Sequence, residues 1–406
     1  MENREERPFE PVLFSEEKTA SFRLGFITLN HPRLLNALNL RMLHLIAGKL
    51  QEWRGRADIV CVVLNAASER AFCSGGDVKS LLFELREGEG ASFVHNYFTY
   101  EYFVDYSVHC YPKPVLCWAD GITMGGGIGI MNGASHRVVT ERTWLAMPEI
   151  FIGLFPDVGG TYFLNRLPEG LGLFLGLTGA RFDGLDAVAI RMAEGLVSSN
   201  KKPHFFAGLL RLPWTGDSQK DKEVLSRYLV RNNEADRADG SLLLKRSDRI
   251  QELTDKDSIE QIDTNLRALK IKDDWFQSAL QGYFGGSPTS AKVIFEQMRR
   301  GKDLSLKDAF LREWDMAIHL CGSSDFYEGV RARLLDRDNR PRWNPPSLGE
   351  VKSAEVEKCF TRRPVRPHPL NQMIAKAGMD CSWARGDWDN AKRACRYSGF
   401  PRSYLL

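Results

Sequence analysis

Two glycine turns decide the predicted fold: Ala71-Phe72-Cys73-Ser74-Gly75-Gly76-Asp77 and Gly121-Ile122-Thr123-Met124-Gly125-Gly126-Gly127. Each turn follows a short apolar run, at residues 59–64 and 114–119, and such runs are typical of strands buried on both faces. Each turn also precedes a helical pattern, so the N–H of Gly76 is expected to be free at a strand-to-helix turn. Two such turns aimed at one point would form an oxyanion hole, in which each donor is worth about 3 kcal/mol. The alternative for the second turn is tight helix packing, which requires glycine equally.

Two carboxylates follow the glycine turns in strongly apolar surroundings. Glu149 lies in Met147-Pro148-Glu149, and Asp157 lies in Pro156-Asp157-Val158-Gly159-Gly160. Burial raises the pKa of a carboxyl group and suits it to proton transfer near neutral pH. The structural alternative makes Asp157 the N-cap of a helix over residues 158–166. Together, the turns and carboxylates indicate acyl chemistry at a carbonyl group without a Ser/His/Asp triad.

A third carboxylate, Glu101, is marked by helical periodicity. Phe93, Tyr97, Val104 and Val108 form one apolar stripe, and Glu101 falls on it. A carboxylate on such a stripe is rarely buried without a partner. Glu101 is therefore predicted to be either a site residue or half of a buried pair.

Other motifs with known chemistry are missing or have a structural explanation. Asp77 is favoured as a helix N-cap, and Cys73 and Ser74 are interpreted as packing residues because no Gly-x-Ser-x-Gly elbow surrounds Ser74. The second turn does not match Gly-x-Gly-x-x-Gly, and the chain has no P-loop, which disfavours a dinucleotide or P-loop site. The eight histidines show no metal-ligand spacing, so no metal is expected.

Composition excludes several classes of protein. The 406 residues are 43% hydrophobic and 26% charged, which is ordinary for a soluble globular protein, and no apolar run approaches the length of a membrane span. The acidic N-terminus lacks the features of a signal or transit peptide, and the eight cysteines include no Cys-x-x-Cys pair. These features predict a cytoplasmic protein with reduced thiols, no membrane partner and no clear import signal.

The formal charge of +3 is unevenly distributed. Residues 351–406 contain eleven Lys and Arg residues against five Asp and Glu residues. A basic segment can bind nucleic acid, but a solvated surface or an oligomer contact is favoured over that interpretation. Association of identical chains is left open by this pattern.

Alternating patterns divide the chain into parts. Strand-like runs at residues 22–29, 59–64, 114–119 and 137–140 alternate with helical ones, which predicts an α/β or layered ββα organisation. Beyond about residue 200 the chain is charge-dense and helical, with good helices at 290–300 and 306–320, until prolines 341, 345 and 346 mark a linker. The expected division is a catalytic core at 1–200, a helical region at 201–346 and a basic tail at 347–406.

At these motifs the sequence resembles the crotonase (enoyl-CoA hydratase/isomerase) superfamily over about residues 20–200, and its thioester hydrolases up to about residue 346. The residues that carry the resemblance are the two glycine turns, Ala146-Met147-Pro148-Glu149, Gly153-Leu154-Phe155-Pro156-Asp157-Val158-Gly159-Gly160, Ser287-Pro288-Thr289-Ser290, Glu328-Gly329-Val330-Arg331-Ala332 and Asp336-Arg337-Asp338. The resemblance implies a crotonase-like ββα spiral core followed by a mainly helical C-terminal region.

The resemblance also implies roles for individual residues. The N–H groups of Gly76 and Gly126 would hold the thioester oxygen, Glu149 and Asp157 would carry hydrolysis, and Glu101 would contact the substrate. The implied reaction is hydrolysis of a short β-hydroxyacyl-CoA thioester, a step of valine degradation. CoA would be part of the substrate, so no cofactor is expected.

One departure bears on the alternatives. The first catalytic glutamate of the hydratases would fall at Gly129, so addition of water to an enoyl thioester is poorly supported. Enoyl-CoA hydration or isomerisation is the alternative within the enzyme class. The alternative outside it is a non-catalytic binding protein on the same fold, which the basic tail would favour.

Overall fold

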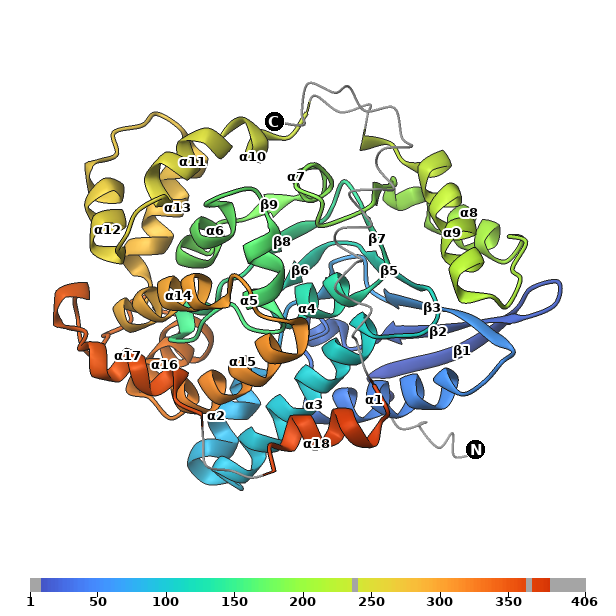
Figure 1. Ribbon diagram of the computed structural model, residues 1–406, viewed down its shortest axis with the longest axis horizontal. Coiled ribbons are helices and arrows are strands. Elements are labelled where there is room, and N and C mark those ends of the chain that lie inside the picture. The colour runs from blue at the N-terminus through green and yellow to red at the C-terminus, as the bar shows by residue number, and fades with distance from the viewer. Residues whose placement is uncertain (1–8, 236–239, 363–366, 380–406) are drawn as a thin grey trace, which may run out of the picture.

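The computed structural model describes residues 9–235, 240–362 and 367–379, with two sheets at the centre enclosed by helices (Figure 1). The larger sheet has the strand order β1-β2-β3-β5-β7-β10, and the smaller sheet has the order β4-β6-β8-β9. The strands of the larger sheet are β1 Val12–Lys18, β2 Arg23–Leu29, β3 Ile59–Ala66, β5 Val115–Ala119, β7 His136–Val139 and β10 Gly195–Leu196. Those of the smaller sheet are β4 Ala71–Cys73, β6 Ile122–Met124, β8 Trp144–Ala146 and β9 Phe182–Asp183.

The order of the elements along the chain is a ββα spiral. A strand of the larger sheet is followed each time by a strand of the smaller one: β3 by β4, β5 by β6, and β7 by β8. Pairing within each sheet is parallel, except for the antiparallel pairs β1–β2 and β8–β9. The predicted α/β core with a ββα spiral is confirmed.

The parallel register of the smaller sheet brings the predicted site motifs together. Cys73 of β4 pairs with Thr123 of β6, and Met124 of β6 pairs with Ala146 of β8. The chain leaves all these strands at the same edge, because parallel strands end on the same side of a sheet. The two glycine turns and the Glu149 turn therefore leave the sheet as neighbours.

Helices and their caps follow the sequence pattern closely in the N-terminal half. The helices up to residue 232 are η1 Pro32–Leu34, α1 Leu40–Arg54, α2 Val78–Glu87, α3 Ala91–His109, α4 Gly126–Gly133, η2 Glu149–Ile152, α5 Gly160–Phe163, η3 Leu164–Arg166, α6 Leu171–Thr178, α7 Gly184–Ala189, η4 Ser199–Lys201, α8 Lys202–Leu209 and α9 Ser218–Asn232. Asn39 caps α1 by accepting the N–H of Met42 at 3.0 Å. Asp77 caps α2, as predicted, by accepting the N–H of Ser80 at 3.2 Å.

Two apolar cores sandwich the larger sheet. The main core lies between the sheets and the helices around α1, α3 and α4. The second core lies on the outer face, where Val63 of β3 and Trp118 of β5 pack against Phe205 of α8 and Leu225 of α9. Every residue of β3 is buried, which explains its continuous apolar run.

The C-terminal helices cover the opposite side of the molecule from α8 and α9 (Figure 1). They are α10 Leu242–Lys245, α11 Ser247–Thr254, α12 Ile259–Ala268, α13 Asp274–Gly285, α14 Pro288–Gly301, α15 Leu306–Cys321, α16 Ser324–Val330, η6 Arg331–Leu335, η7 Leu348–Glu350, α17 Ser353–Phe360 and α18 Pro369–Lys376. Helices α14 and α15 contact α5, and α16 contacts η2, so this region reaches the segments that carry Asp157 and Glu149.

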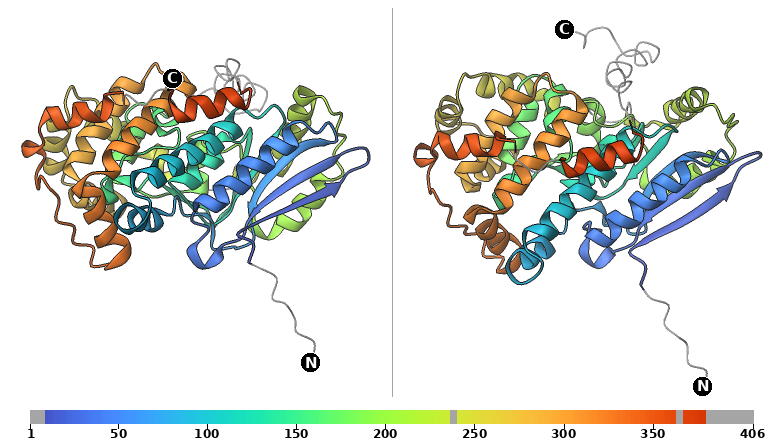
Figure 2. Two further views of the ribbon diagram at one scale, coloured as in Figure 1. Left: turned by 90° about the horizontal axis from the view of Figure 1, so that it is seen from below. Right: turned by 60° about the horizontal axis from the view of Figure 1, so that its bottom comes forward.

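The described part of the basic segment packs on the rest of the chain. Helix α18 lies alongside α3 (Figure 2), and the guanidinium of Arg54 in α1 donates to the carbonyl oxygens of Ala377 at 2.7 Å and Gly378 at 2.9 Å. Residues 380–406, which complete the predicted basic tail, lie outside the described residues.

Most cysteines in the described part of the chain are free thiols in the core. Cys61, Cys73, Cys117, Cys321 and Cys359 are free and buried. Cys110, which follows α3, is bonded in a disulfide, so the prediction of reduced thiols throughout is wrong at this position. Across residues 9–235, 240–362 and 367–379, no helix combines the length and apolar character needed to span a membrane.

Candidate active site

Gly76 and Gly126 face one another at the edge of the smaller sheet. Gly76 follows β4, and Gly126 begins α4 directly after β6. A Cβ atom placed on Gly126 would lie 3.4 Å from the nitrogen of Gly76 and 2.9 Å from Oε1 of Glu101. A Cβ on Gly76 would lie 2.5 Å from the hydroxyl of Tyr97 and 3.0 Å from the same Oε1. Any side chain at either position would fill the space between the two backbones.

Within the part of the chain that the structure describes, the N–H groups of Gly76 and Gly126 donate no hydrogen bond to a protein acceptor. Their neighbours do: the N–H of Asp77 donates to Leu38 at 2.9 Å, and the N–H of Gly125 donates to Ala146 at 3.2 Å. The N–H groups of Gly76 and Gly126 thus remain available close to one another, which is what the predicted oxyanion hole requires.

Glu149 reaches the same place from the end of β8, at the start of η2. Its Oε1 atom would lie 2.8 Å from a Cβ on Gly125, whose φ of +49° is one that glycine adopts readily. The side chain is 6% exposed, and its Oε2 atom is buried without a hydrogen-bond partner among the described residues. A buried and unpaired carboxylate oxygen is costly unless it serves a ligand or a reaction.

Glu101 enters from α3, opposite the two glycines. It is 3% exposed, and Tyr97 donates a hydrogen bond of 3.3 Å from its hydroxyl to Oε1 of Glu101. The carbonyl oxygen of Leu38 lies 2.8 Å from the same hydroxyl, so the two acceptors share its single proton. Glu101 therefore has a hydrogen-bond partner and lies close to both Gly76 and Gly126. Its role as a site residue stays a prediction.

Asp157 lies in the loop that precedes α5 and is 7% exposed. The hydroxyl of Tyr102 donates a hydrogen bond of 2.7 Å to its Oδ2 atom. Asp157 is not the N-cap of a helix over residues 158–166: α5 begins at Gly160, and Gly159 is its N-cap residue. The capping interpretation is therefore wrong.

Burial dominates the electrostatics of the site. It raises the pKa of Glu149 and of Glu101 well above the ordinary glutamate value, and the charge of Asp157 adds to both shifts. Burial raises the pKa of Asp157 to about 6, although the hydrogen bond from Tyr102 opposes the shift. Carboxyl groups tuned in this way exchange protons near neutral pH.

Three polar residues of the site region were not predicted from the sequence. Tyr102 binds Asp157, as described above. Asp105 is one turn beyond Glu101 in α3; it is 1% exposed, and both of its carboxylate oxygens lack partners among the described residues. Glu313 of α15 is fully buried and accepts the N–H groups of Gly159 and Thr161 at 2.7 Å each. The absence of Lys and Arg from residues 91–109 could have indicated a fully buried helix, which would have pointed to Tyr102 and Asp105.

The environment of Gly129 is closed to a larger side chain. A Cβ at this position would lie 2.6 Å from Cβ of Val158 and 3.0 Å from Oδ2 of Asp105. A glutamate at position 129 would therefore meet both a hard steric contact and a like-charged neighbour. The structure thus gives a physical reason why a carboxylate does not stand at this point of α4.

The arrangement suits chemistry at a thioester carbonyl. Two main-chain donors can stabilise a developing oxyanion, and Glu149 and Asp157 can attack, accept a proton or deliver one. No group of three or more His, Cys, Asp or Glu side chains with metal-binding geometry occurs within residues 9–235, 240–362 and 367–379.

Fold and site together define a protein of the crotonase class. The sequence profile of the enoyl-CoA hydratase/isomerase family matches residues 24–360, and the chain belongs to this family. In three dimensions it is similar to an enoyl-CoA hydratase from Rhodobacter sphaeroides, with a TM-score of 0.77 and 32% identity, over 88% of this chain and 99% of that one.

Curated relatives resemble the chain over most of its length. A protein of Gallus gallus named 3-hydroxyisobutyryl-CoA hydrolase, mitochondrial, is 37% identical over 83% of this chain and 86% of its own. A protein of Danio rerio with the same name is 37% identical over 84% of this chain and 87% of its own. Because these relatives are named mitochondrial, the prediction of a cytoplasmic protein is wrong, and the comparison points to the mitochondrion.

Proposed function

We propose that the chain hydrolyses 3-hydroxyisobutyryl-CoA to 3-hydroxyisobutyrate and CoA, as a step of valine degradation. The observation that carries the proposal is the pair of available N–H groups at Gly76 and Gly126, placed beside the buried carboxyl groups of Glu149 and Glu101. The names of the relatives from Gallus gallus and Danio rerio support the choice of substrate.

In the proposed reaction Glu149 attacks the thioester carbon, or activates a water molecule that does so. Negative charge then builds on the carbonyl oxygen, where the N–H groups of Gly76 and Gly126 stabilise it. The bond from carbon to sulfur breaks, the hydroxyl of water ends on the acyl carbon, and a proton goes to the CoA thiolate. The two routes differ only in whether a mixed anhydride on Glu149 forms before water enters.

Asp157 moves protons and orients the β-hydroxyl of the acyl group in this proposal. Its pKa of about 6 makes it ionised at neutral pH, ready to accept a proton or the hydroxyl hydrogen bond. Glu101 contacts the substrate close to the oxyanion in this proposal, and burial raises the pKa of its carboxyl group well above the ordinary glutamate value. The chemistry needs no further cofactor, because CoA arrives as part of the substrate.

Hydration of an enoyl-CoA is the second candidate, because the Rhodobacter sphaeroides structure carries a hydratase name. The closed surroundings of Gly129 weigh against it, since the position has no room for a second catalytic carboxylate. The two reactions leave different products. Hydrolysis releases a free thiol, whereas hydration removes the conjugated enoyl absorbance without thiol release.

The decisive experiment measures thiol release from a panel that includes 3-hydroxyisobutyryl-CoA, 3-hydroxypropionyl-CoA and a conjugated enoyl-CoA. We expect release from the two β-hydroxy thioesters. Glu149→Gln and Asp157→Asn should each lower kcat by about 100-fold or more while the protein stays folded. Loss of enoyl absorbance without thiol release by the wild type would favour hydration instead.

The matched control is Asp221→Asn in α9. Asp221 is a buried carboxylate that accepts the N–H groups of Thr215 at 2.7 Å and Gly216 at 3.1 Å on the outer side of the larger sheet. Its loss should lower stability but leave kcat unchanged. Turnover close to wild type in Glu149→Gln or Asp157→Asn would overturn the role of that carboxylate.

A further inference from the structure

The loop that carries Asp157 has a strained backbone directly after that residue. Val158, which follows Asp157 directly, has a φ of +51°, and Gly159 has a φ of +88°. Positive φ is strained for a β-branched residue and persists only where the surroundings enforce it. Within the loop itself, a bond of 2.7 Å from the N–H of Gly160 to the carbonyl of Asp157 closes the turn.

The enforcing contact comes from α15. Oε2 of Glu313 accepts the N–H of Gly159, and Oε1 accepts the N–H of Thr161, each at 2.7 Å. The side chain is 0% exposed, so these bonds do not compete with water. One carboxyl group therefore bridges the backbone two and four residues beyond Asp157.

A second contact holds the other end of the loop. Nε2 of Gln297 in α14 donates to the carbonyl of Pro156 at 2.6 Å and to Oγ1 of Thr161 at 2.8 Å. Gln297 is also fully buried. The residue before Asp157 and the residues after it are thus fixed from neighbouring helices of the C-terminal region.

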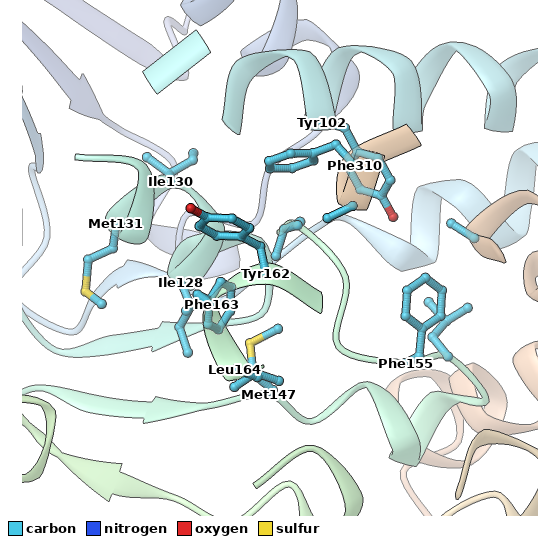
Figure 3. Packing of buried hydrophobic residues seen from close by; sticks show 14 of the residues in the cluster. Tyr102, Ile128, Ile130, Met131, Met147, Phe155, Tyr162, Phe163, Leu164 and Phe310 are labelled. Atoms are coloured by element: carbon cyan, nitrogen blue, oxygen red, sulfur yellow. The ribbon is translucent and has the colours of Figure 1, made fainter. Parts of the chain in front are cut away.

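The ring of Phe310 packs against the same loop. Phe310, one turn before Glu313 in α15, would lie 3.1 Å from a Cβ on Gly159, so a larger residue would displace the loop. Its ring lies 6.0 Å from that of Tyr102, centroid to centroid. Figure 3 labels both residues. Helix α15 therefore supports both Asp157 and the phenol that donates to it.

We propose that Glu313 is a positioning residue, whose carboxyl group holds the backbone of Gly159 and Thr161 so that Asp157 stays at the reaction centre. Glu313 itself touches neither substrate nor reacting atoms in this arrangement. The expected change in kcat rests on the proposed function. The hydrogen bonds from Gly159 and Thr161 to Glu313 can be tested by hydrogen exchange, which requires no enzyme assay.

Glu313→Gln is the sharpest variant, because glutamine keeps the size but has a single acceptor oxygen. Its amide nitrogen would face one of the two N–H donors, so one bond is lost and replaced by an opposed pair of donors. We expect hydrogen exchange at the amides of Gly159 and Thr161 to speed up by about tenfold or more.

The kinetic readout separates positioning from binding. Small displacement of a reacting group lowers the rate of the chemical step far more than substrate affinity, so kcat should fall by about 10- to 100-fold, while KM stays within about twofold. Glu313→Asp keeps the carboxyl group but withdraws it by one methylene, and an intermediate loss is expected. This second variant decides the matter if Glu313→Gln does not fold.

Asp221→Asn is again the matched control, because it removes one acceptor oxygen from a buried carboxylate that grips two main-chain N–H groups elsewhere. It should leave kcat and exchange at Gly159 and Thr161 unchanged. The inference is overturned if both Glu313 variants leave exchange at these amides at the wild-type rate, or change exchange without changing kcat. If the wild type releases no thiol from any thioester, the proposed function fails, and the exchange result alone decides the inference.

Discussion

The hydroxyl of Tyr102 donates a hydrogen bond of 2.7 Å to Oδ2 of Asp157 and connects α3 to the loop before α5. Glu101, the preceding residue of α3, lies beside the two glycines, with Oε1 2.9 Å from a Cβ placed on Gly126. One helix therefore carries a buried carboxyl group beside the glycines and the phenol that donates a hydrogen bond to a second carboxyl group. The pKa of Asp157 depends on this arrangement, because the phenol stabilises the ionised form against burial.

Tyr102→Phe should shift the acid limb of the activity profile. Removal of the donor leaves burial unopposed, so the pKa of Asp157 should rise from about 6, by about one unit. The fraction of ionised Asp157 then falls most at mildly acid pH, and kcat should drop more near pH 6 than near pH 8. Measuring kcat across this range checks the sign; an equal loss at every pH would contradict it.

Gly126→Ala should block the space between the N–H groups of Gly76 and Gly126. The new methyl group would lie 3.4 Å from the nitrogen of Gly76 and 2.9 Å from Oε1 of Glu101, where the thioester oxygen must enter. We expect kcat to fall by about 100-fold or more, the effect of losing one oxyanion donor. Gly48→Ala is the control, since a Cβ there meets nothing within 4 Å. It should keep full activity and add about 0.5–1 kcal/mol of stability to α1.

Asp157→Asn should stabilise the folded protein at alkaline pH. Burial raises the folded-state pKa of Asp157 from 3.8 to about 6, so the native protein binds this proton more tightly than the unfolded chain does. Stability is therefore full below about pH 4 and is lost as the pH rises through about 6. The variant removes that loss, which amounts to at most about 3 kcal/mol.

Denaturant unfolding of the wild type and Asp157→Asn at low and at high pH tests this sign. The two proteins should be equally stable near pH 4, and the variant should be more stable near pH 8. A variant that is less stable than the wild type at pH 8 would show that Asp157 supports the fold rather than straining it.

Gly129→Glu should not create a hydratase. The side chain would start 2.6 Å from Cβ of Val158 and close to the carboxyl group of Asp105. We expect a lower melting temperature and an overpacking cost of about 1–3 kcal/mol, with no loss of enoyl absorbance from a conjugated enoyl-CoA. Adding Val158→Gly should recover part of the stability, because it removes the steric contact. Enoyl hydration by the single variant would contradict the steric argument.

Local patterns were sufficient to predict the parts of the site that lie next to their own strands. Glycine turns after buried strands predicted the free N–H of Gly76, and the apolar company of Glu149 predicted its burial. These signals act within a few residues, which is the range over which strand, turn and helix preferences operate. The nearby positions of Gly76 and Gly126 follow from the pairing of β4 with β6. The resemblance implied only that their two N–H groups act together.

Other parts depended on contacts that no local pattern carries. Glu101 was placed on an apolar stripe, yet α3 is buried on nearly all sides, so periodicity could not separate Tyr102 or Asp105 from core residues. Glu313 is separated from Gly159 by 154 residues, and its own helix is ordinary and amphipathic. Strand β1 was not predicted, because the polar run Ser15-Glu16-Glu17-Lys18 in its second half is typical of a loop.

The shared edge of β4, β6 and β8 has a consequence for how such a centre can change. The donors come from two successive repeats of the spiral, while Glu149 comes from the third and Asp157 from the loop beyond it. Replacing the segments that carry Glu149 and Asp157 would leave the backbone at Gly76 and Gly126 intact. A scaffold organised in this way can exchange one reaction for another through changes confined to these two segments, while the backbone at Gly76 and Gly126 stays the same.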